Sequence, residues 1–215
     1  MNLNNIQEEF TKGFELLKKY PKSVSFFGSS LFKEDNEHYR TARRLAGQFA
    51  KLGYAIITGA GGGIMEAANR GAFEVGGQSV GLNIKLQETQ SPNKYLTDST
   101  EFSYFFSRKT VLSFAAEAYL FFPGGFGTLD EFFEILELLH TKKIFPVPLI
   151  LVGSDYWNKL DDFIRQEVFK RHQAIKEKDM LIYQIVDDEE TIIKLVTELP
   201  KAENRVFSTE YRNNN

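Results

Sequence analysis

Short apolar runs alternate along the chain with segments of helical period. The runs are SVSFF at 23–27, YAIIT at 54–58, QSVGL at 78–82, AYLFF at 118–122 and VPLILV at 147–152. Continuous apolar runs of this length are typical of strands buried on both faces, and the spacing between them leaves room for crossover helices. The pattern predicts an α/β fold built on an open, doubly wound parallel sheet. In such a sheet, ligands bind at the carboxyl ends of the strands.

The helices are predicted from apolar residues at steps of three and four. An N-terminal helix ends before Pro21, and we expect it to form a lid or a partner surface. A further helix is expected near 188–199, and the polar loop at 87–99 is predicted to lack regular structure. The apolar stripes of the four clearest helices are Leu3, Ile6, Phe10, Phe14 and Leu17; Tyr39, Ala42, Leu45, Phe49 and Leu52; Phe132, Phe133, Leu136 and Leu139; and Tyr156, Leu160, Phe163, Ile164 and Val168.

The length of 215 residues suits one domain with short additions: a helix over 1–20, the sheet domain over 21–200 and a polar tail over 201–215. An apolar fraction of 42% and a charged fraction of 26% lie in the globular range. A net charge of −3 provides no overall basic field, so we expect neither nucleic acid nor a membrane as a partner. The N-terminus has no apolar leader and no stretch is long enough to span a bilayer, which predicts a cytoplasmic protein.

Cysteine is absent, which excludes disulfides, thiolate metal sites and cysteine nucleophiles. The three histidines are too scattered to suggest a histidine metal cluster. The chemistry therefore depends on other groups, and we expect no metal.

Three turns that follow predicted strands are rich in small residues. At the start of a helix, such turns bring unpaired N–H groups close to an anion, whereas a single turn of this kind more often serves only to reverse the chain. A P-loop is excluded because no turn ends in Gly-Lys-Ser/Thr, and Ile64 replaces the third glycine of the dinucleotide pattern. The three together predict a cradle for one monophosphate. They are Gly28-Ser29-Ser30, Gly59-Ala60-Gly61-Gly62-Gly63 and Pro123-Gly124-Gly125-Phe126-Gly127-Thr128.

Glu131 lies three residues after Thr128, where it either closes a capping box or places a carboxylate beside the cradle. Glu134 shares nearly the same helical face; it is expected to be a solvated neighbour that can raise the pKa of Glu131. Arg108 and Lys109 precede a predicted helical stretch. Such a pair is usually a surface feature, but here it can reach the same sheet edge, where arginine offers a planar fork for phosphate or carboxylate.

Three parts of the sequence together resemble the Lonely Guy family of nucleoside 5′-monophosphate phosphoribohydrolases, often labelled as lysine decarboxylases. They are the motif Pro123-Gly124-Gly125-x-Gly127-Thr128-x-x-Glu131, the upstream pair Arg108-Lys109, and the segment Ile64-Met65-Glu66-Ala67-Ala68-Asn69 that follows the middle turn. The likeness covers about residues 23–169. It implies a Rossmann-like fold, a homodimer or an assembly of dimers, and hydrolysis of the N-glycosidic bond of adenine-type nucleotides, cytokinin precursors included.

The resemblance implies catalytic roles for Arg108 and Glu131. Glu131 would stabilise an oxocarbenium-like state and orient or deprotonate water, while Arg108 would hold the phosphate or orient Glu131. This mechanism requires no cofactor. The candidate substrate contacts, taken from the turns and the matched motifs, are Gly28, Ser29, Gly61, Gly62, Gly63, Met65, Lys109, Gly124, Gly125, Gly127 and Thr128.

The sequence departs from the family at two positions. Ala60 replaces a glycine of the middle turn, where a positive φ is expected, and Glu137 aligns with a threonine that contacts substrate in plant members. Three other functions stay open: a carrier of a nucleotide-like cofactor similar to molybdenum cofactor carriers, a structural or regulatory oligomer, and a decarboxylase. The decarboxylase is the weakest of these because no lysine is marked out for a Schiff base.

Overall fold

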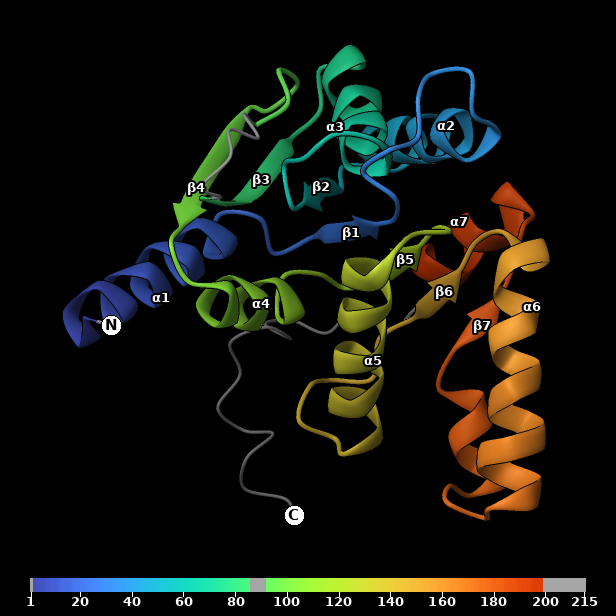
Figure 1. Ribbon diagram of the computed structural model, residues 1–215. Coiled ribbons are helices and arrows are strands. Elements are labelled where there is room, and N and C mark those ends of the chain that lie inside the picture. Colours follow the sequence, from blue (N-terminus) through green and yellow to red (C-terminus); the bar gives the residue numbers. More distant parts are fainter. Residues whose placement is uncertain (1, 86–91, 199–215) are drawn as a thin grey trace.

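The computed structural model describes residues 2–85 and 92–198, which form one α/β domain around a seven-stranded parallel sheet (Figure 1). The strand order is β4-β3-β2-β1-β5-β6-β7, and every neighbouring pair is parallel. The predicted doubly wound sheet is therefore confirmed. The strands are β1 (Ser23–Phe27), β2 (Ala55–Thr58), β3 (Ser79–Ile84), β4 (Asp98–Phe102), β5 (Tyr119–Phe121), β6 (Leu149–Leu151) and β7 (Gln184–Ile185).

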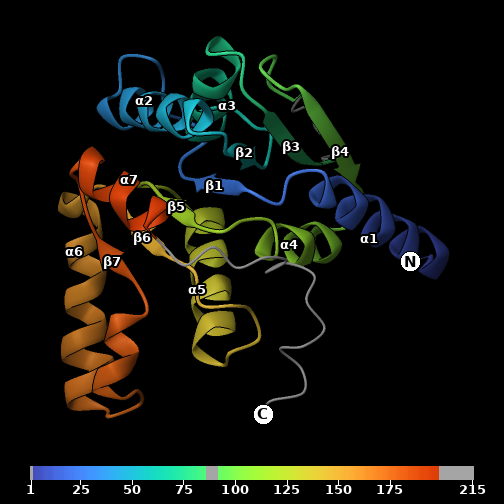
Figure 2. The same ribbon diagram turned by 180° about the vertical axis from the view of Figure 1, so that it is seen from behind.

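Helices cover both faces of the sheet, as Figures 1 and 2 show from opposite sides. One face packs against α2, α3 and α7, and the other packs against α1, α4, α5 and α6. The helices are α1 (Leu3–Lys18), α2 (Glu37–Lys51), α3 (Ile64–Glu74), α4 (Phe105–Ser113), α5 (Phe126–His140), α6 (Ser154–Phe163) and α7 (Glu189–Thr197). A π-helical segment, η1 (Ile164–Arg171), continues α6, and a short 3-10 helix, η2 (Glu177–Leu181), precedes β7.

The central strands are buried on both faces, as their continuous apolar runs predict. Phe26 points into the core beneath α2 and α3, while the next residue, Phe27, points into the core beneath α4 and α5. The same alternation separates Leu120 from Phe121 on β5. Each central strand thus contributes side chains to two cores, and even the polar residues of β1, Ser23 and Ser25, are fully buried.

Two chain segments differ from the sequence-based expectation. The segment at 87–99 was predicted to lack regular structure, but Asp98 and Ser99 begin β4, and 86–91 lie outside the described residues. β4 is an edge strand with an alternating burial pattern in which Phe102 is the buried residue, so no apolar run marks it. The predicted polar tail at 201–215 also lies outside the described residues.

The N-terminal helix, predicted to form a lid or a partner surface, is anchored in the core at its C-terminal end. α1 buries Leu16 and Leu17 in the cluster beneath the sheet and packs against α4 and β4. Most residues of the expected stripes are buried or half-buried, but four are exposed: Leu3 at 76%, Leu52 at 45%, Phe133 at 43% and Phe163 at 55%. Within the described ranges, the helices are too short or too polar to cross a membrane.

The chain order reverses between β1 and β5, which lie side by side at the centre of the sheet. Phe27 at the end of β1 is in register with Phe121 at the end of β5. The turns after these two strands are therefore neighbours at one sheet edge. In a doubly wound sheet, such a switch point opens the crevice that receives a ligand.

Candidate functional site

A cleft of about 370 Å³ opens at this switch point. Its walls come from the loop after β1, the start of α3, the first turns of α4 and the first turns of α5. The lining residues are Phe27, Gly28, Ser29, Ser30, Leu31, Met65, Phe105, Arg108, Lys109, Gly125, Phe126, Gly127, Thr128, Asp130 and Glu131.

The cleft brings together most of the predicted site residues but not the middle turn. Both predicted catalytic residues line it, together with seven of the predicted substrate contacts: Gly28, Ser29, Met65, Lys109, Gly125, Gly127 and Thr128. The other four predicted contacts lie outside its lining: Gly61, Gly62, Gly63 and Gly124. Sequence reasoning missed the apolar lining residues Leu31, Phe105 and Phe126. Phe126 had a weak signal, since it fills the variable position of the PGGxGT motif.

The first turn does not lead directly into a helix, which corrects the sequence-based expectation. β1 ends at Phe27 and α2 begins only at Glu37. The backbone of Ser29 instead joins two neighbouring turns: its N–H donates to the carbonyl of Pro123 at 3.0 Å, and its carbonyl accepts from the N–H of Ile64 at 2.9 Å. This loop therefore fixes the positions of the other two turns relative to each other.

The middle turn, residues 59–63, lies outside the cleft lining but packs against the loop after β1. Gly63 has φ +64°, and a Cβ there would lie 2.1 Å from the carbonyl oxygen of Ser29, so only glycine fits. Ala60 has φ +63°, as expected for a position that favours glycine. Its conformation is held by Thr58, whose Oγ1 accepts from the Ala60 N–H, and by Asn93, whose N–H donates to the Ala60 carbonyl.

The third turn presents a helix N-terminus to the cleft. α5 begins at Phe126 with Gly125 as its N-cap, no side chain in the described structure caps it, and its first turn holds no acidic residue. Thr128 lies inside the first turn, so the capping box with Glu131 does not form. The N–H groups of a first helical turn lack partners within the helix, and together with the helix dipole they attract an anion.

Arg108 and Glu131 face each other across the cleft. Arg108 lies within α4 rather than before it, and its Nη1 is 3.7 Å from Oε1 of Glu131 on α5. Their side chains are 13% and 8% exposed, so the attraction acts in a poorly solvated setting. Arg108 Nε donates to the carbonyl of Leu82 on β3 at 3.1 Å, which anchors the base of the guanidinium.

Glycine 59 makes room for this arginine. A Cβ at Gly59 would lie 2.1 Å from Nη2 of Arg108 and 3.0 Å from the sulfur of Met65. The middle turn thus contributes to the site through the space that Gly59 leaves. The sequence pattern alone could not show this, because a glycine that leaves space for a side chain looks the same as a glycine needed for a tight turn.

Burial raises the pKa of Glu131 to about 7; Arg108 opposes this increase and the nearby Glu134 adds to it. Burial likewise lowers the pKa of Arg108, with Glu131 acting in the opposite direction. Oε2 of Glu131 is buried without a hydrogen-bond partner among the described residues. A buried carboxylate oxygen with this pKa can accept a proton near neutrality.

Lys109 lies on the same helix as Arg108 but contacts other acids. Its Nζ is 2.7 Å from Oδ2 of Asp130 and 2.9 Å from Oε2 of Glu134, both on α5. These ion pairs raise the pKa of Lys109 against the effect of burial. Glu134 is therefore a paired, half-buried group rather than the solvated neighbour expected from sequence.

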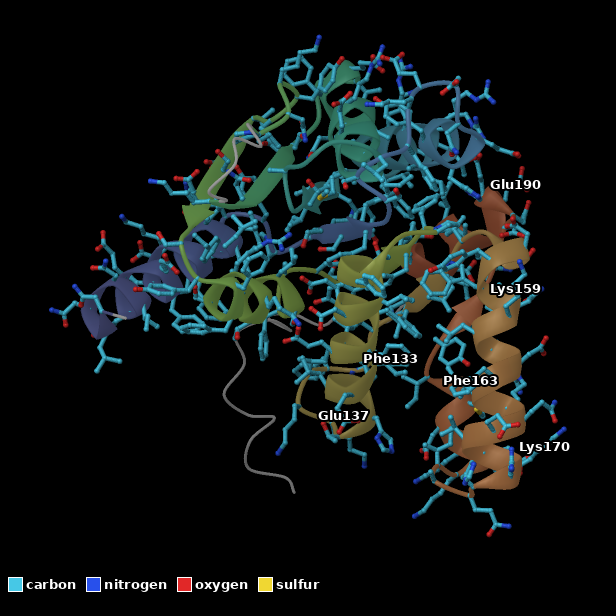
Figure 3. The ribbon with its side chains drawn as sticks, in the orientation of Figure 1. Phe133, Glu137, Lys159, Phe163, Lys170 and Glu190 are labelled. Atoms are coloured by element: carbon cyan, nitrogen blue, oxygen red, sulfur yellow. The ribbon has the colours of Figure 1, made fainter. Side chains whose placement is uncertain are left out.

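Two other sequence-based expectations concern Glu137 and a metal site. Glu137 lies near the far end of α5 from the sheet, outside the cleft lining, and its carboxylate is 3.4 Å from Nδ1 of His140 (Figure 3). Across residues 2–85 and 92–198, no group of three or more His, Asp or Glu side chains is arranged to hold a metal ion.

The chain is similar to known proteins over most of its length. The chain is 28% identical over 172 residues to the pyrimidine/purine nucleotide 5′-monophosphate nucleosidase of Escherichia coli, a match that covers 72% of this chain and only 37% of that enzyme. It is 26% identical over 148 residues to the cytokinin riboside 5′-monophosphate phosphoribohydrolase of Rhodococcoides fascians, covering 67% of this chain and 74% of the relative.

A solved structure of a molybdenum cofactor binding protein from Rippkaea orientalis shares the fold. The TM-score is 0.60 at 20% identity, over 81% of this chain and 95% of that one. The family model described as "Possible lysine decarboxylase" matches residues 65–196, which is more than half of the chain. This protein therefore belongs to the Lonely Guy family, which that model represents.

Proposed function

We propose that the protein hydrolyses the N-glycosidic bond of nucleoside 5′-monophosphates to give free base and ribose 5-phosphate. The observation that carries this proposal is the buried carboxylate of Glu131, which lies 3.7 Å from Arg108 and has one oxygen without a hydrogen-bond partner among the described residues. The same cleft holds the start of α5, which none of the described side chains caps. A general acid or base and an anion site thus share one cleft.

The 5′-phosphate is proposed to bind at the start of α5. Gly125, Gly127 and Thr128 line the cleft there, and a Cβ at either glycine would meet no atom of the described residues within 4 Å. The first-turn N–H groups and the helix dipole supply the attraction. Binding energy from this remote group can then position the glycosidic bond beside Glu131.

Glu131 is proposed to act on the sugar and the attacking water. Cleavage of a ribosyl N-glycosidic bond develops positive charge at the anomeric carbon, which an ionised carboxylate stabilises. The same carboxylate, with a pKa of about 7, can remove a proton from water as the new C–O bond forms and the C–N bond breaks. The leaving base carries away the bonding electron pair and takes up a proton from solvent, while Glu131 returns to solvent the proton that it took from water.

Arg108 is proposed to orient Glu131 and to favour its ionised form. Its guanidinium is anchored by the Leu82 carbonyl at one side and faces Glu131 at the other. A planar fork held at two points fixes direction as well as charge.

The base is proposed to be a purine of the adenine type, prenylated adenine included. Two observations support this: the name of the related cytokinin riboside 5′-monophosphate phosphoribohydrolase, and the apolar side chains of Leu31, Phe105 and Phe126 that line the cleft. An apolar, aromatic wall suits the face of a flat base.

The decisive test compares adenosine monophosphate with adenosine. We expect release of adenine and ribose 5-phosphate from the monophosphate, and a catalytic efficiency lower by orders of magnitude for the nucleoside, because several charge-assisted contacts worth about 1.5–3 kcal/mol each are lost. Comparable efficiency on both substrates would refute the phosphate site at α5.

Glu131→Gln tests the catalytic role directly. We expect the rate to fall by about 10² or more with nucleotide binding retained, since the amide keeps the shape but loses the charge. The exposed Glu190→Gln serves as the matched control (Figure 3). Turnover near that of the unaltered protein would contradict the mechanism. Tight monophosphate binding without base release by the unaltered protein would favour a non-catalytic carrier, since the structural neighbour from Rippkaea orientalis is named as a cofactor binding protein.

A homodimer or an assembly of dimers is also proposed, with each site completed near its edge by the partner. Support comes from large apolar side chains exposed on the helix layer beneath the site, namely Phe105, Phe106, Phe133 and Phe163.

A further inference from the structure

The N-terminal helix α1 packs directly against α4, the helix that carries Arg108. The approach is close at Gly13, where a Cβ would lie 2.8 Å from a methyl group of Val111 on α4 and 2.9 Å from the ring of Phe102. In Figure 1, α1 lies beside α4 on the same side of the sheet. A displacement of α1 would therefore also displace α4.

Glu9 of α1 is a buried acid that the proposed mechanism does not use. It is 9% exposed, and its Oε1 accepts from the N–H of Ser103 at 2.6 Å. Its Oε2 accepts from the hydroxyl of Ser107, a residue with no exposed surface. The carboxylate thus lies against the start of α4, where a negative charge is favoured by the helix dipole.

These contacts lie on the turn that bears Arg108. The N–H of Arg108 donates to the carbonyl of Tyr104 at 3.2 Å, and the Ser107 hydroxyl lies 2.9 Å from the same carbonyl. Glu9 therefore holds Ser103 and Ser107, which lie before and after Tyr104 in the chain. The carbonyl of Tyr104 accepts a hydrogen bond from Arg108 in the first turn of α4.

We propose that Glu9 is a positioning residue that, through Ser103 and Ser107, sets the first turn of α4 and with it the placement of Arg108 opposite Glu131. The activity readouts of this proposal rest on the proposed function, whereas the stability readout described below does not.

The charged groups around Glu131 determine the direction of the expected effect. Arg108 and Lys109 face it from α4, and Asp130 and Glu134 face it from α5. Loss of the Glu9 contacts lets the first turn of α4 move, so the attraction of Arg108 for the Glu131 carboxylate weakens. The pKa of Glu131 then rises further, and the acid limb of the rate profile moves to higher pH.

The experiment compares Glu9→Ala, Glu9→Gln and the control Glu8→Ala. Glu8 is the neighbouring acid on α1, exposed and paired with Lys12 at 2.5 Å. We expect Glu9→Ala to lower kcat by about 10- to 100-fold with little change in KM, because small displacements of catalytic groups are costly in rate. Glu9→Gln should restore most of the rate, since its amide can donate to the Ser107 oxygen while that hydroxyl turns to Tyr104.

A stability readout separates this proposal from the proposed function. The difference in unfolding free energy between Glu131→Gln and its parent is measured across pH 5–9 in the wild-type and Glu9→Ala backgrounds. We expect its pH midpoint to be higher in the Glu9→Ala background. If the wild-type protein releases no base, the proposed function fails and this measurement still decides the role of Glu9.

An unchanged midpoint together with an unchanged kcat in Glu9→Ala would overturn the proposal, as would equal losses in Glu9→Ala and Glu8→Ala. If Glu9→Ala does not fold, Ser107→Ala carries the same test, because it removes the hydroxyl contact and leaves the carboxylate and the Ser103 contact in place.

Discussion

Replacing Glu131 with glutamine should make the protein more stable at alkaline pH, although it removes the proposed catalytic group. Burial raises the pKa of Glu131 from the usual 4.5 to about 7 in the folded state. The folded protein therefore binds the proton more tightly than the unfolded chain. The stability contributed by this proton is fully present below pH 4.5 and is lost as the pH rises through 7.

The magnitude follows from the difference between the two pKa values. At about 1.4 kcal/mol for each pKa unit, the full alkaline penalty is of the order of 3 kcal/mol. Glutamine has no charge to bury, so the Glu131→Gln variant escapes this penalty above pH 7 and matches the wild type most closely at low pH. For a chain of this length, Glu131→Gln should therefore have a Tm about 6–12 °C above that of the wild type at alkaline pH.

Urea unfolding of both proteins between pH 5 and pH 9 measures the effect. The quantity of interest is the change with pH of the difference in unfolding free energy, because any constant offset reflects only the altered hydrogen bonding of the amide. Glu190→Gln on α7 is the control and should give a nearly flat difference. A change of less than about 0.5 kcal/mol for Glu131→Gln over this range would refute the pKa assignment.

Three other predictions concern the site and its assembly. Arg108→Lys should lose nearly as much kcat as Arg108→Ala, because an ammonium group cannot bridge the Leu82 carbonyl and Glu131 as a fork does; wild-type rates for the lysine variant would show that only diffuse charge matters. Gly59→Ala should lower kcat by about 10- to 100-fold with the fold retained by circular dichroism, because its Cβ would lie 2.1 Å from Nη2 of Arg108; an unchanged kcat would mean that the guanidinium moves without consequence. Sedimentation should give a mass of two chains or a multiple of two, and a fully active monomer at nanomolar concentration would contradict a shared site.

Local patterns were sufficient wherever burial is uniform along an element. The strands β1 and β2 are buried at every residue, so their apolar runs could be recognised without knowledge of their neighbours. β4 could not be recognised in this way, because an edge strand is held by the backbone of β3 and needs few apolar side chains. The N-terminal helix was found, but its partner was not, since an apolar stripe does not specify what covers it.

The candidate site also has features that could be predicted from the sequence and features that depend on tertiary contacts. The resemblance of the motif to a known family was enough to predict that Arg108, Glu131 and the glycine-rich turn before α5 form one site, whereas the residues alone left a capping box and a surface pair as alternatives. Three other features became visible only in the folded chain: the loop after β1 joins the other two turns, Gly59 leaves space for Arg108, and Glu9 contacts the start of α4. These relations depend on distances between segments far apart in the chain, and the burial that raises the pKa of Glu131 exists only once those segments have packed together.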